Sequence, residues 1–300
     1  MFTGKICRLF KISELSGVFL RVFVKIWKNF LFFGEIFLTF NFRGNKIEVY
    51  WIVGELFLVI LSMEIIYSDG PVLVINKPAG ILVQSPPGID SLVDQIKEYY
   101  RELEGKPSDA NIYLGVPHRL DRPATGCMIF ARHARAAKRI SDQFQMRMVV
   151  KKYWVLVSGI VPEDRGDWED FIRKVPGEPR SEIVTSRHPE GRWSLLHYVV
   201  KKRYPEKNCT WLEIELETGR THQIRLQTSS RGFPVLGDSQ YGSNVPFGEQ
   251  FEDERLRAIA LHSRSIRLRH PMREERIFIE APLPGNWKEF LGEDPEGQIS

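Results

Sequence analysis

The segment ETGRTHQIR, residues 217–225, combines Gly, Thr, His, Gln and two Arg at a predicted junction between a loop and a helix. About a hundred residues earlier, HRLD at residues 118–121 ends in a single carboxylate among cations. Positive charge keeps a partly buried carboxylate ionised, so Asp121 is suited to act as a nucleophile or a base. Alone, an Asp beside Arg is more typical of a structural ion pair. The two segments together favour one active site.

Four further segments extend the pattern: NKPAG at 76–80, KKYWVLV at 151–157, GFPVLGDSQYG at 232–242 and ALHSRSIRLRHP at 260–271. In sequence and order, these segments resemble the RluA-type pseudouridine synthases over roughly residues 64–284. The resemblance implies an α+β fold with a mixed, mostly antiparallel central sheet and flanking helices, the pseudouridine synthase catalytic fold. It also implies an isomerase that converts uridine to pseudouridine in structured RNA, either rRNA or tRNA.

The resemblance implies a role for each of four residues. Asp121 is the catalytic residue, which attacks the anomeric carbon of the target uridine or abstracts a ribose proton. Arg225 is its ionic partner. Tyr153 stacks on the base and assists removal of the proton on carbon 5. Arg119 enters the RNA as the target nucleotide leaves its stack, because an enzyme reaches a base inside a helix by flipping it out.

Other residues of the matching segments are expected to shape the substrate pocket. His118 is expected to order the loop rather than to transfer a proton, and Thr218 to cap a helix that Gly232 ends. The remaining substrate-binding candidates are Lys77, Thr218, Gly219, Arg220, His222 and His262. One position departs from the family, where Thr-Ser-Gly is usual and Ala124-Thr125-Gly126 stands here. We expect a local rearrangement of the loop without loss of activity.

Local charge points to RNA more than net charge does. The formal net charge is +4, but residues 1–62 hold 8 Lys and Arg against 4 Asp and Glu, and the rest of the chain is balanced at 34 of each. Residues 119–152 carry nine basic residues against two acidic ones, and 255–276 carry seven against two. Such clusters are typical of phosphate-backbone binding, although each alone would be typical of a solvated face. We expect Arg135, Lys138 and Arg139 to bind RNA.

The sequence lacks the motifs that are typical of several classes of chemistry. The three Cys have no metal-site or redox spacing, and the seven His form neither an HExxH nor a Cys/His knuckle. No Walker A sequence and no GxGxxG after a strand is present. Isomerisation needs no external reagent, so we expect no cofactor and no metal. The sequence favours a cytoplasmic protein that is a monomer by default, with RNA as its partner and no membrane attachment.

Residues 1–62 differ in composition from residues 63–300. They contain 11 of the 19 Phe, but no Pro, Ala, Asp, His or Gln. The longest uncharged run, 56–63, has eight residues, too few for the 18 or so that a spanning helix needs. We expect Met63 to be the natural start and the preceding segment to be an upstream region; the alternative is an interfacial or partner-binding extension. Residues 63–300 form the catalytic domain, without an S4-like RNA-binding domain.

Periodicity predicts the elements of residues 63–300. Apolar runs or alternation predict strands at 63–67, 72–76, 127–130, 153–157, 210–217, 259–268 and 276–280. Helical spacing predicts helices at 91–104, where Ser91 and Asp94 indicate a capped start, and at 134–148.

Two other functions compete with this one. A non-catalytic RNA-binding or ribosome-assembly protein could retain the fold, but the presence of Asp121, Tyr153 and Arg225 argues against it. Hydrolysis of a nucleoside glycosidic bond would typically use a second carboxylate or a metal, and no such partner stands out.

Overall fold

The computed structural model describes residues 37–43, 46–53, 56–59 and 63–292. By its contacts the chain divides into one unit of residues 1–62 and 101–107, and a second unit of 63–100 and 108–300. In the first unit, β1 (Phe37–Arg43), β2 (Lys46–Val53) and β3 (Leu56–Val59) pair in order as an antiparallel sheet. The expectation about the origin of residues 1–62 concerns residues that lie largely outside the described ones.

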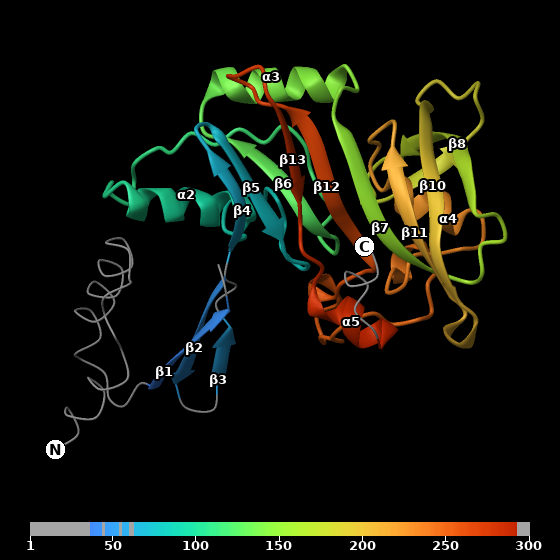
Figure 1. Ribbon diagram of the computed structural model, residues 1–300, viewed down its shortest axis with the longest axis horizontal. Helices are drawn as coiled ribbons and strands as arrows, with labels where there is room; N and C mark the ends of the chain where they lie inside the picture. The colour runs from blue at the N-terminus through green and yellow to red at the C-terminus, as the bar shows by residue number, and fades with distance from the viewer. Residues whose placement is uncertain (1–36, 44–45, 54–55, 60–62, 293–300) are drawn as a thin grey trace. The chain divides into compact units, whose positions relative to one another are not determined.

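The second unit is built on a ten-stranded sheet (Figure 1). Its strand order is β4-β5-β6-β12-β7-β11-β10-β8-β9, and β13 also pairs with β12. All pairings are antiparallel except that of β6 with β12. The strands are β4 (Glu64–Asp69), β5 (Val72–Lys77), β6 (Thr125–Ala131), β7 (Val150–Ser158), β8 (Arg165–Lys174), β9 (Ser181–Val184), β10 (Arg192–Tyr204), β11 (Cys209–Leu216), β12 (Leu261–Arg269) and β13 (Arg276–Glu280).

Two helices cover opposite faces of β5 and β6. Because successive side chains of a strand point to opposite faces, Val72 and Val74 pack toward α3 (Ala134–Gln145), while Leu73 and Ile75 pack toward α2 (Leu92–Leu103). Both strands are therefore apolar along their whole length. The predicted cap of α2 is present, since the backbone N–H of Asp94 donates to Ser91 Oγ at 3.3 Å.

The other half of the sheet, β7, β11, β10 and β8, packs against two short helices. These are α4 (Gln223–Ser229) and α5 (Gly285–Leu291). Ile224 of α4 and the fully buried Trp287 of α5 belong to one apolar cluster with Leu156, Leu196 and other strand residues. The α4 helix is thereby held against the sheet, with its first turn beside the segment that precedes β6.

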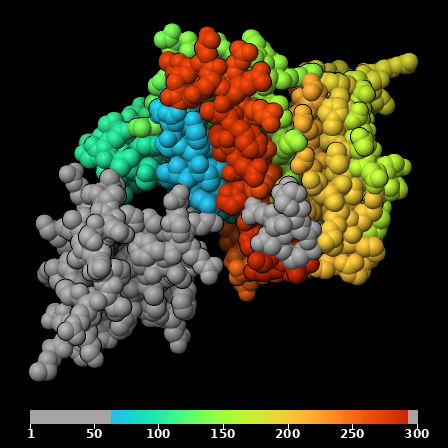
Figure 2. Space-filling view, viewed as in Figure 1, coloured from blue at the N-terminus to red at the C-terminus, as the bar shows by residue number. Residues whose placement is uncertain are grey.

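Strand β12 joins the two halves of the sheet. It runs parallel to β6 through His262 and Ser263, and antiparallel to β7 on its other side. The approach to β6 is close, because a Cβ on Gly126 would lie 2.4 Å from the carbonyl oxygen of Ser263, and Gly126 has φ +111°. Only glycine fits there. On the face shown in Figure 2, the segment of β4 and β5 lies beside that of β12 and β13.

The α+β class with a mixed, mostly antiparallel sheet is confirmed, and each predicted strand is present. Three details are corrected. The helix predicted at 134–148 ends at Gln145, and Arg147 has a left-handed φ of +56°. Thr218 does not cap a helix, because α4 begins only at Gln223. The strands β8, β9 and β10 were not predicted. No helix within the described residues has both the length and the apolar content needed to cross a bilayer.

Candidate active site

Asp121 lies in the segment that leads into β6. A backbone hydrogen bond from Ala124 N to the Asp121 carbonyl, 3.1 Å, turns the chain just before the strand. The Asp121 side chain is 25% exposed, so its carboxylate is held by protein and still open to a ligand. Ala124, which stands where the family pattern has Thr, is fully buried in the apolar cluster, where a threonine hydroxyl would need a partner.

Arg225 on α4 reaches Asp121 across 104 residues of sequence. Its Nη1 lies 3.3 Å from Asp121 Oδ2, and its side chain is only 4% exposed. The same guanidinium donates from Nε and Nη2 to the two oxygens of Asp238, at 2.6 and 2.7 Å, and from Nη2 to Gln240 Oε1 at 2.8 Å. A bidentate pair fixes both the position and the plane of an Arg. Asp238 therefore aims the remaining nitrogen of Arg225 at Asp121.

His222 stands at the start of α4 with a left-handed φ of +56°, a conformation that costs a non-glycine residue about 1–2 kcal/mol. Its Nδ1 lies 3.0 Å from the Tyr241 hydroxyl, and its Nε2 lies 3.8 Å from Asp121 Oδ1. Burial lowers the pKa of His222, although the negative charge of Asp121 opposes that shift. The ring thus lines the side of the site next to Arg225.

Tyr153 belongs to β7 and pairs with Ser263 of β12. Its side chain is buried, at 7% exposure. Burial raises the pKa of the Tyr153 phenol above its usual value, and the charge of Asp121 adds to the shift. The hydroxyl consequently keeps its proton at neutral pH.

Lys77 lies behind the Asp121 segment and is completely buried. Its Nζ donates to three backbone carbonyls, those of Pro78 at 2.7 Å, Ala124 at 2.9 Å and Arg122 at 3.1 Å. Three acceptors match the three hydrogens of an ammonium group. Burial lowers the pKa of Lys77 to about 7, and the charge of Asp121 opposes the shift. Lys77 thus ties the segment around Asp121 to the end of β5.

Two histidines brace the same segment from inside the protein. His118 Nε2 accepts from the backbone N–H of Ile129 at 2.9 Å, and its ring stacks on Phe144 with centroids 4.8 Å apart. His262 is fully buried, with Nδ1 2.8 Å from Thr125 Oγ1 and Nε2 3.2 Å from the Ala281 carbonyl. Burial lowers the pKa of each ring to about 3. Both rings have protein partners and are neutral at physiological pH.

The loop before α4 contains a set of hydrogen bonds to Gln223 and a cluster of cations. Thr218 is buried and donates to Gln223 Oε1 at 2.8 Å, which also accepts from Arg220 N at 3.0 Å. Gly219 is exposed, as is Arg220. Burial lowers the pKa of Arg220, and the nearby charges of Arg147 and Arg192 add to the shift.

Lys151 extends this cluster from β7. Burial lowers the pKa of its ammonium to about 8, an effect opposed by Glu217 and supported by Arg147. Arg147, Lys151, Arg192 and Arg220, here called the loop-side cations, gather around this loop, and Lys151 is also close enough to His118 to help lower the pKa of that ring. Among the described residues, Glu217 lies 3.6 Å from Arg147 as an ion-pair partner.

The predicted RNA-binding residues of α3 lie apart from these cations. Arg135 is exposed, Lys138 pairs with Asp142 at 2.9 Å, and Arg139 donates to the Pro271 carbonyl at 2.7 Å. Arg119 is exposed next to Asp121. The structure thus brings the half-buried Asp121, the buried Arg225, and His222 together, with the exposed Arg119 next to Asp121, whereas Lys77, Thr218 and His262 are inside the protein.

Asp238 is the main residue that sequence reasoning missed. It is 1% exposed and belongs to the GFPVLGDSQYG segment, in which the sequence pattern assigns no role to any one residue. A buried carboxylate near a required Arg could have been suspected from that segment. No group of three or more potential metal ligands occurs among the described residues.

Comparison with protein families matches residues 71–230 to the family described as RNA pseudouridylate synthase. Ribosomal large subunit pseudouridine synthase D of Haemophilus ducreyi is 32% identical over 242 residues, which cover 77% of this chain and 70% of the relative. Ribosomal large subunit pseudouridine synthase C of the same organism is 32% identical over 237 residues, covering 77% and 69%.

Solved structures agree with these matches. Human RNA Pseudouridylate Synthase Domain Containing 4 superposes with a TM-score of 0.59 at 24% identity, covering 74% of this chain and 88% of the human one. Human RNA Pseudouridylate Synthase Domain Containing 1 gives 0.56 at 25% identity, covering 74% and 84%.

Proposed function

Because this chain belongs to the RluA-type RNA pseudouridine synthases, isomerases that convert uridine to pseudouridine in RNA, we propose that Asp121 is the residue that begins the reaction. The observation that carries this proposal is the 3.3 Å contact between Asp121 and an Arg225 that Asp238 holds in place. A guanidinium that is itself fixed in place holds the Asp121 carboxylate in position to act on the ribose.

The reaction conserves all atoms of the uridine. Asp121 either attacks the anomeric carbon or removes a ribose proton, and the bond from that carbon to N1 of uracil breaks. The freed base turns, carbon 5 bonds to the anomeric carbon, and the proton on carbon 5 is lost while N1 gains one. Attack of a carboxylate on the anomeric carbon of a sugar is also the covalent step of retaining glycosidases. Arg225 stabilises the charge of Asp121 at the start and end of this cycle.

Tyr153 is proposed to position the base. Its buried phenol stays protonated at neutral pH, so it offers a ring face for stacking and an O–H for donation. A phenol with a raised pKa is poorly matched to accept the proton of carbon 5. Lys77, Thr218 and His262 are proposed to support the pocket from behind, since their polar atoms are already bonded to protein. His118 is proposed to order the loop.

We propose structured ribosomal RNA as the substrate, and transfer RNA as the second candidate. Two similar proteins are named for the large ribosomal subunit. The loop-side cations surround the loop before α4, the helix that carries Arg225, and there they can bind the phosphates that flank a flipped nucleotide. Arg135, Lys138 and Arg139 of α3 would extend that RNA path. A monomer acting in the cytoplasm, where such RNA is found, is the simplest form of this enzyme.

Replacing Asp121 by Asn tests the chemistry. The variant should bind an RNA substrate within about twofold of the wild type, and lose at least about a thousandfold in pseudouridine formation. Asp164→Asn, at an exposed carboxylate near the start of β8, is the matched control and should retain full activity. Pseudouridine is measured by mass spectrometry of nuclease digests. Persistent modification by Asp121→Asn would refute the assignment.

The substrate itself can be found in the host. Mapping pseudouridines in total RNA with and without this gene should reveal at least one uridine that depends on it. Loss confined to ribosomal RNA would support the first candidate, and loss confined to transfer RNA would support the second.

A further inference from the structure

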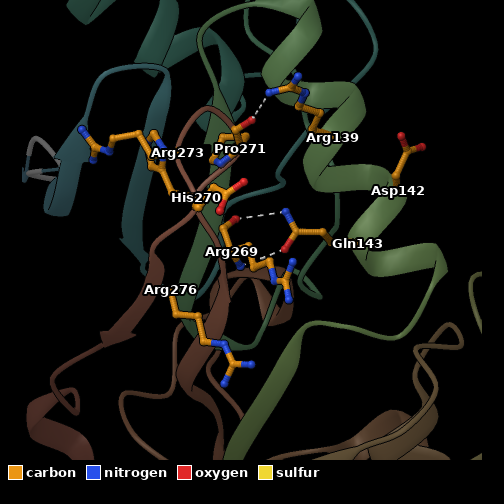
Figure 3. Close-up of a pocket in the computed structure, with 9 residues that line it drawn as sticks. Arg139, Asp142, Gln143, Arg269, His270, Pro271, Arg273 and Arg276 are labelled. Atoms are coloured by element: carbon orange, nitrogen blue, oxygen red, sulfur yellow. Dashed lines mark hydrogen bonds between the residues drawn. The ribbon is translucent and has the colours of Figure 1, made fainter.

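A second basic site lies where α3 meets the turn between β12 and β13 (Figure 3). A pocket of about 440 Å³ opens there, within the range of ligand-binding cavities. Its lining joins the two basic stretches of the sequence, 119–152 and 255–276, and carries four arginines against two carboxylates. The charged lining residues are Arg139, Arg269, Arg273, Arg276, Asp142 and Glu274. We call this pocket the turn pocket.

Two of these arginines occupy opposite positions on paired strands. Arg269 of β12 and Arg276 of β13 are directly opposite in the register, and both are exposed. Like charges directly opposite on paired strands destabilise a sheet. Within the described part of the chain neither side chain has an ion-pair partner, whereas Arg273 pairs with Asp69 and Glu275. A bound anion would therefore relieve the repulsion between Arg269 and Arg276.

The turn pocket is held in shape by α3. Gln143 donates to the Arg269 carbonyl at 3.0 Å and accepts from Arg269 N at 2.8 Å, and Arg139 donates to the Pro271 carbonyl (Figure 3). These bonds fix the backbone from which Arg269 projects. A fixed backbone limits where the Arg269 guanidinium can reach, and a guanidinium can bind a phosphate through two N–H donors.

His270 adds a donor to the wall of the turn pocket. Its Nδ1 accepts from the backbone N–H of Met272 at 3.3 Å, so the neutral ring carries its proton on Nε2. Nε2 is buried and has no hydrogen-bond partner among the described residues. An N–H dipole that is not neutralised by an acceptor adds to the positive potential of this wall.

We propose that the turn pocket binds a phosphate of the RNA backbone at a distance from the target uridine. The proposal rests on the proposed function and specifies a second contact with the same substrate. β12 begins beside the active site, where Ser263 pairs with Tyr153, and ends at Arg269. Six residues of strand span about 20 Å, or roughly six nucleotides at about 3.4 Å each along one strand. The RNA must therefore extend that far from the target to reach the turn pocket.

The test uses two RNA hairpins with a uridine in the loop, one with a stem of about ten base pairs and one with a stem of about three. The double variant Arg269→Gln/Arg276→Gln should bind the long hairpin about three- to tenfold more weakly than wild type, with a salt slope reduced by about one to two. Its affinity for the short hairpin and its kcat should not change. The thermal midpoint should stay the same or rise, because the opposed charges are gone.

The control Arg165→Gln/Lys201→Gln removes the same charge from exposed positions of β8 and β10 and should leave both affinities unchanged. Equal affinities of the two double variants for the long hairpin would overturn the proposal. So would an equal loss of affinity of Arg269→Gln/Arg276→Gln for both hairpins. If inorganic phosphate at matched ionic strength raises the thermal midpoint while RNA affinity is unaffected by the double variant, the pocket holds a free anion and the proposal is wrong. The affinity measurement does not depend on catalysis. A wild-type protein that binds RNA but forms no pseudouridine would therefore contradict the proposed function and leave the proposal for the turn pocket intact.

Discussion

Arg225 is bound more tightly to Asp238 than to Asp121. Two of its nitrogens lie 2.6 and 2.7 Å from the Asp238 carboxylate, and only one approaches Asp121, at 3.3 Å. Asp238 is 1% exposed, whereas Asp121 is open to a ligand. The buried carboxylate thus neutralises the guanidinium and fixes its direction, while the accessible one remains available for chemistry.

Asp238→Asn should lower kcat by about ten- to a hundredfold while KM changes little, because Asp121 loses an oriented partner and the RNA-binding surface is untouched. Stability should also fall by about 3–5 kcal/mol, since one member of a buried ion pair is removed. Steady-state kinetics and guanidinium unfolding measure the two effects. Gln240→Ala, which removes the Gln240 contact of Arg225 and an exposed bond from Gln240 to the Pro179 carbonyl, should cost clearly less in both; equal losses would show that Asp238 has no special role.

Lys77→Met should destabilise the protein by about 3 kcal/mol or more. The carbonyls of Pro78, Arg122 and Ala124 each lose a donor, although Gly80 N still donates to the Arg122 carbonyl at 2.9 Å, and a buried unsatisfied group costs about 1–3 kcal/mol. Because two of those carbonyls belong to Arg122 and Ala124, activity should fall further than stability alone explains. Lys201→Met, at an exposed lysine of β10, is the control. A Lys77→Met enzyme that is as stable and active as this control would contradict the bracing role.

Acid should destabilise the protein through its buried histidines. The pKa of His118 and of His262 is lowered to about 3 by burial, against 6.5 in an unfolded chain. Between those values the unfolded state binds more protons, so the free energy of unfolding falls as pH falls, by about 1.4 kcal/mol per pH unit for each ring. The contribution is fully present above pH 6.5. Urea unfolding of wild type and His262→Gln from pH 7.5 to 4.5 should give a shallower slope for the variant; identical slopes would exclude His262.

Arg119→Ala should reveal whether Arg119 fills the place of a flipped base. With a uridine in a stacked helix, kcat/KM should drop about ten- to a hundredfold, because a flipped base costs a few kcal/mol of stacking. With an unstructured single strand the loss should be only a few-fold. Arg119 is exposed, so stability should not change. The same loss on both substrates would point instead to a simple phosphate contact.

Much of the sheet could be predicted because its strands are apolar or alternate clearly. Val72–Lys77 is buried almost throughout, and Cys209–Leu216 alternates toward its end, so both patterns stand out in the sequence. Arg165–Lys174 was missed because charged residues occupy most of its positions. It is a strand because β10 pairs with it, a long-range contact that no local pattern records.

The sequence motifs predicted part of the site, and the roles of its residues stay predictions. Asp121 and Arg225 were expected to pair, and a contact of 3.3 Å joins them in the structure. The capping of α4 was wrong because the Thr218 hydroxyl bonds to the Gln223 side chain instead of to a helix N–H. The role of Asp238 was not predicted because its position opposite Arg225 depends on how the loop after α4 folds back. The spacing of residues along the chain does not determine that fold.

The place of β12 in the sheet has a consequence during synthesis of the protein. This strand comes from residues 261–269, yet it separates β6, which carries the Asp121 segment, from β7, which carries Tyr153. A ribosome-bound chain that has emerged only as far as α4 contains Asp121 and Tyr153 but lacks the strand that joins the two halves of the sheet. The sheet that carries both residues is therefore complete only after β12 has been synthesised.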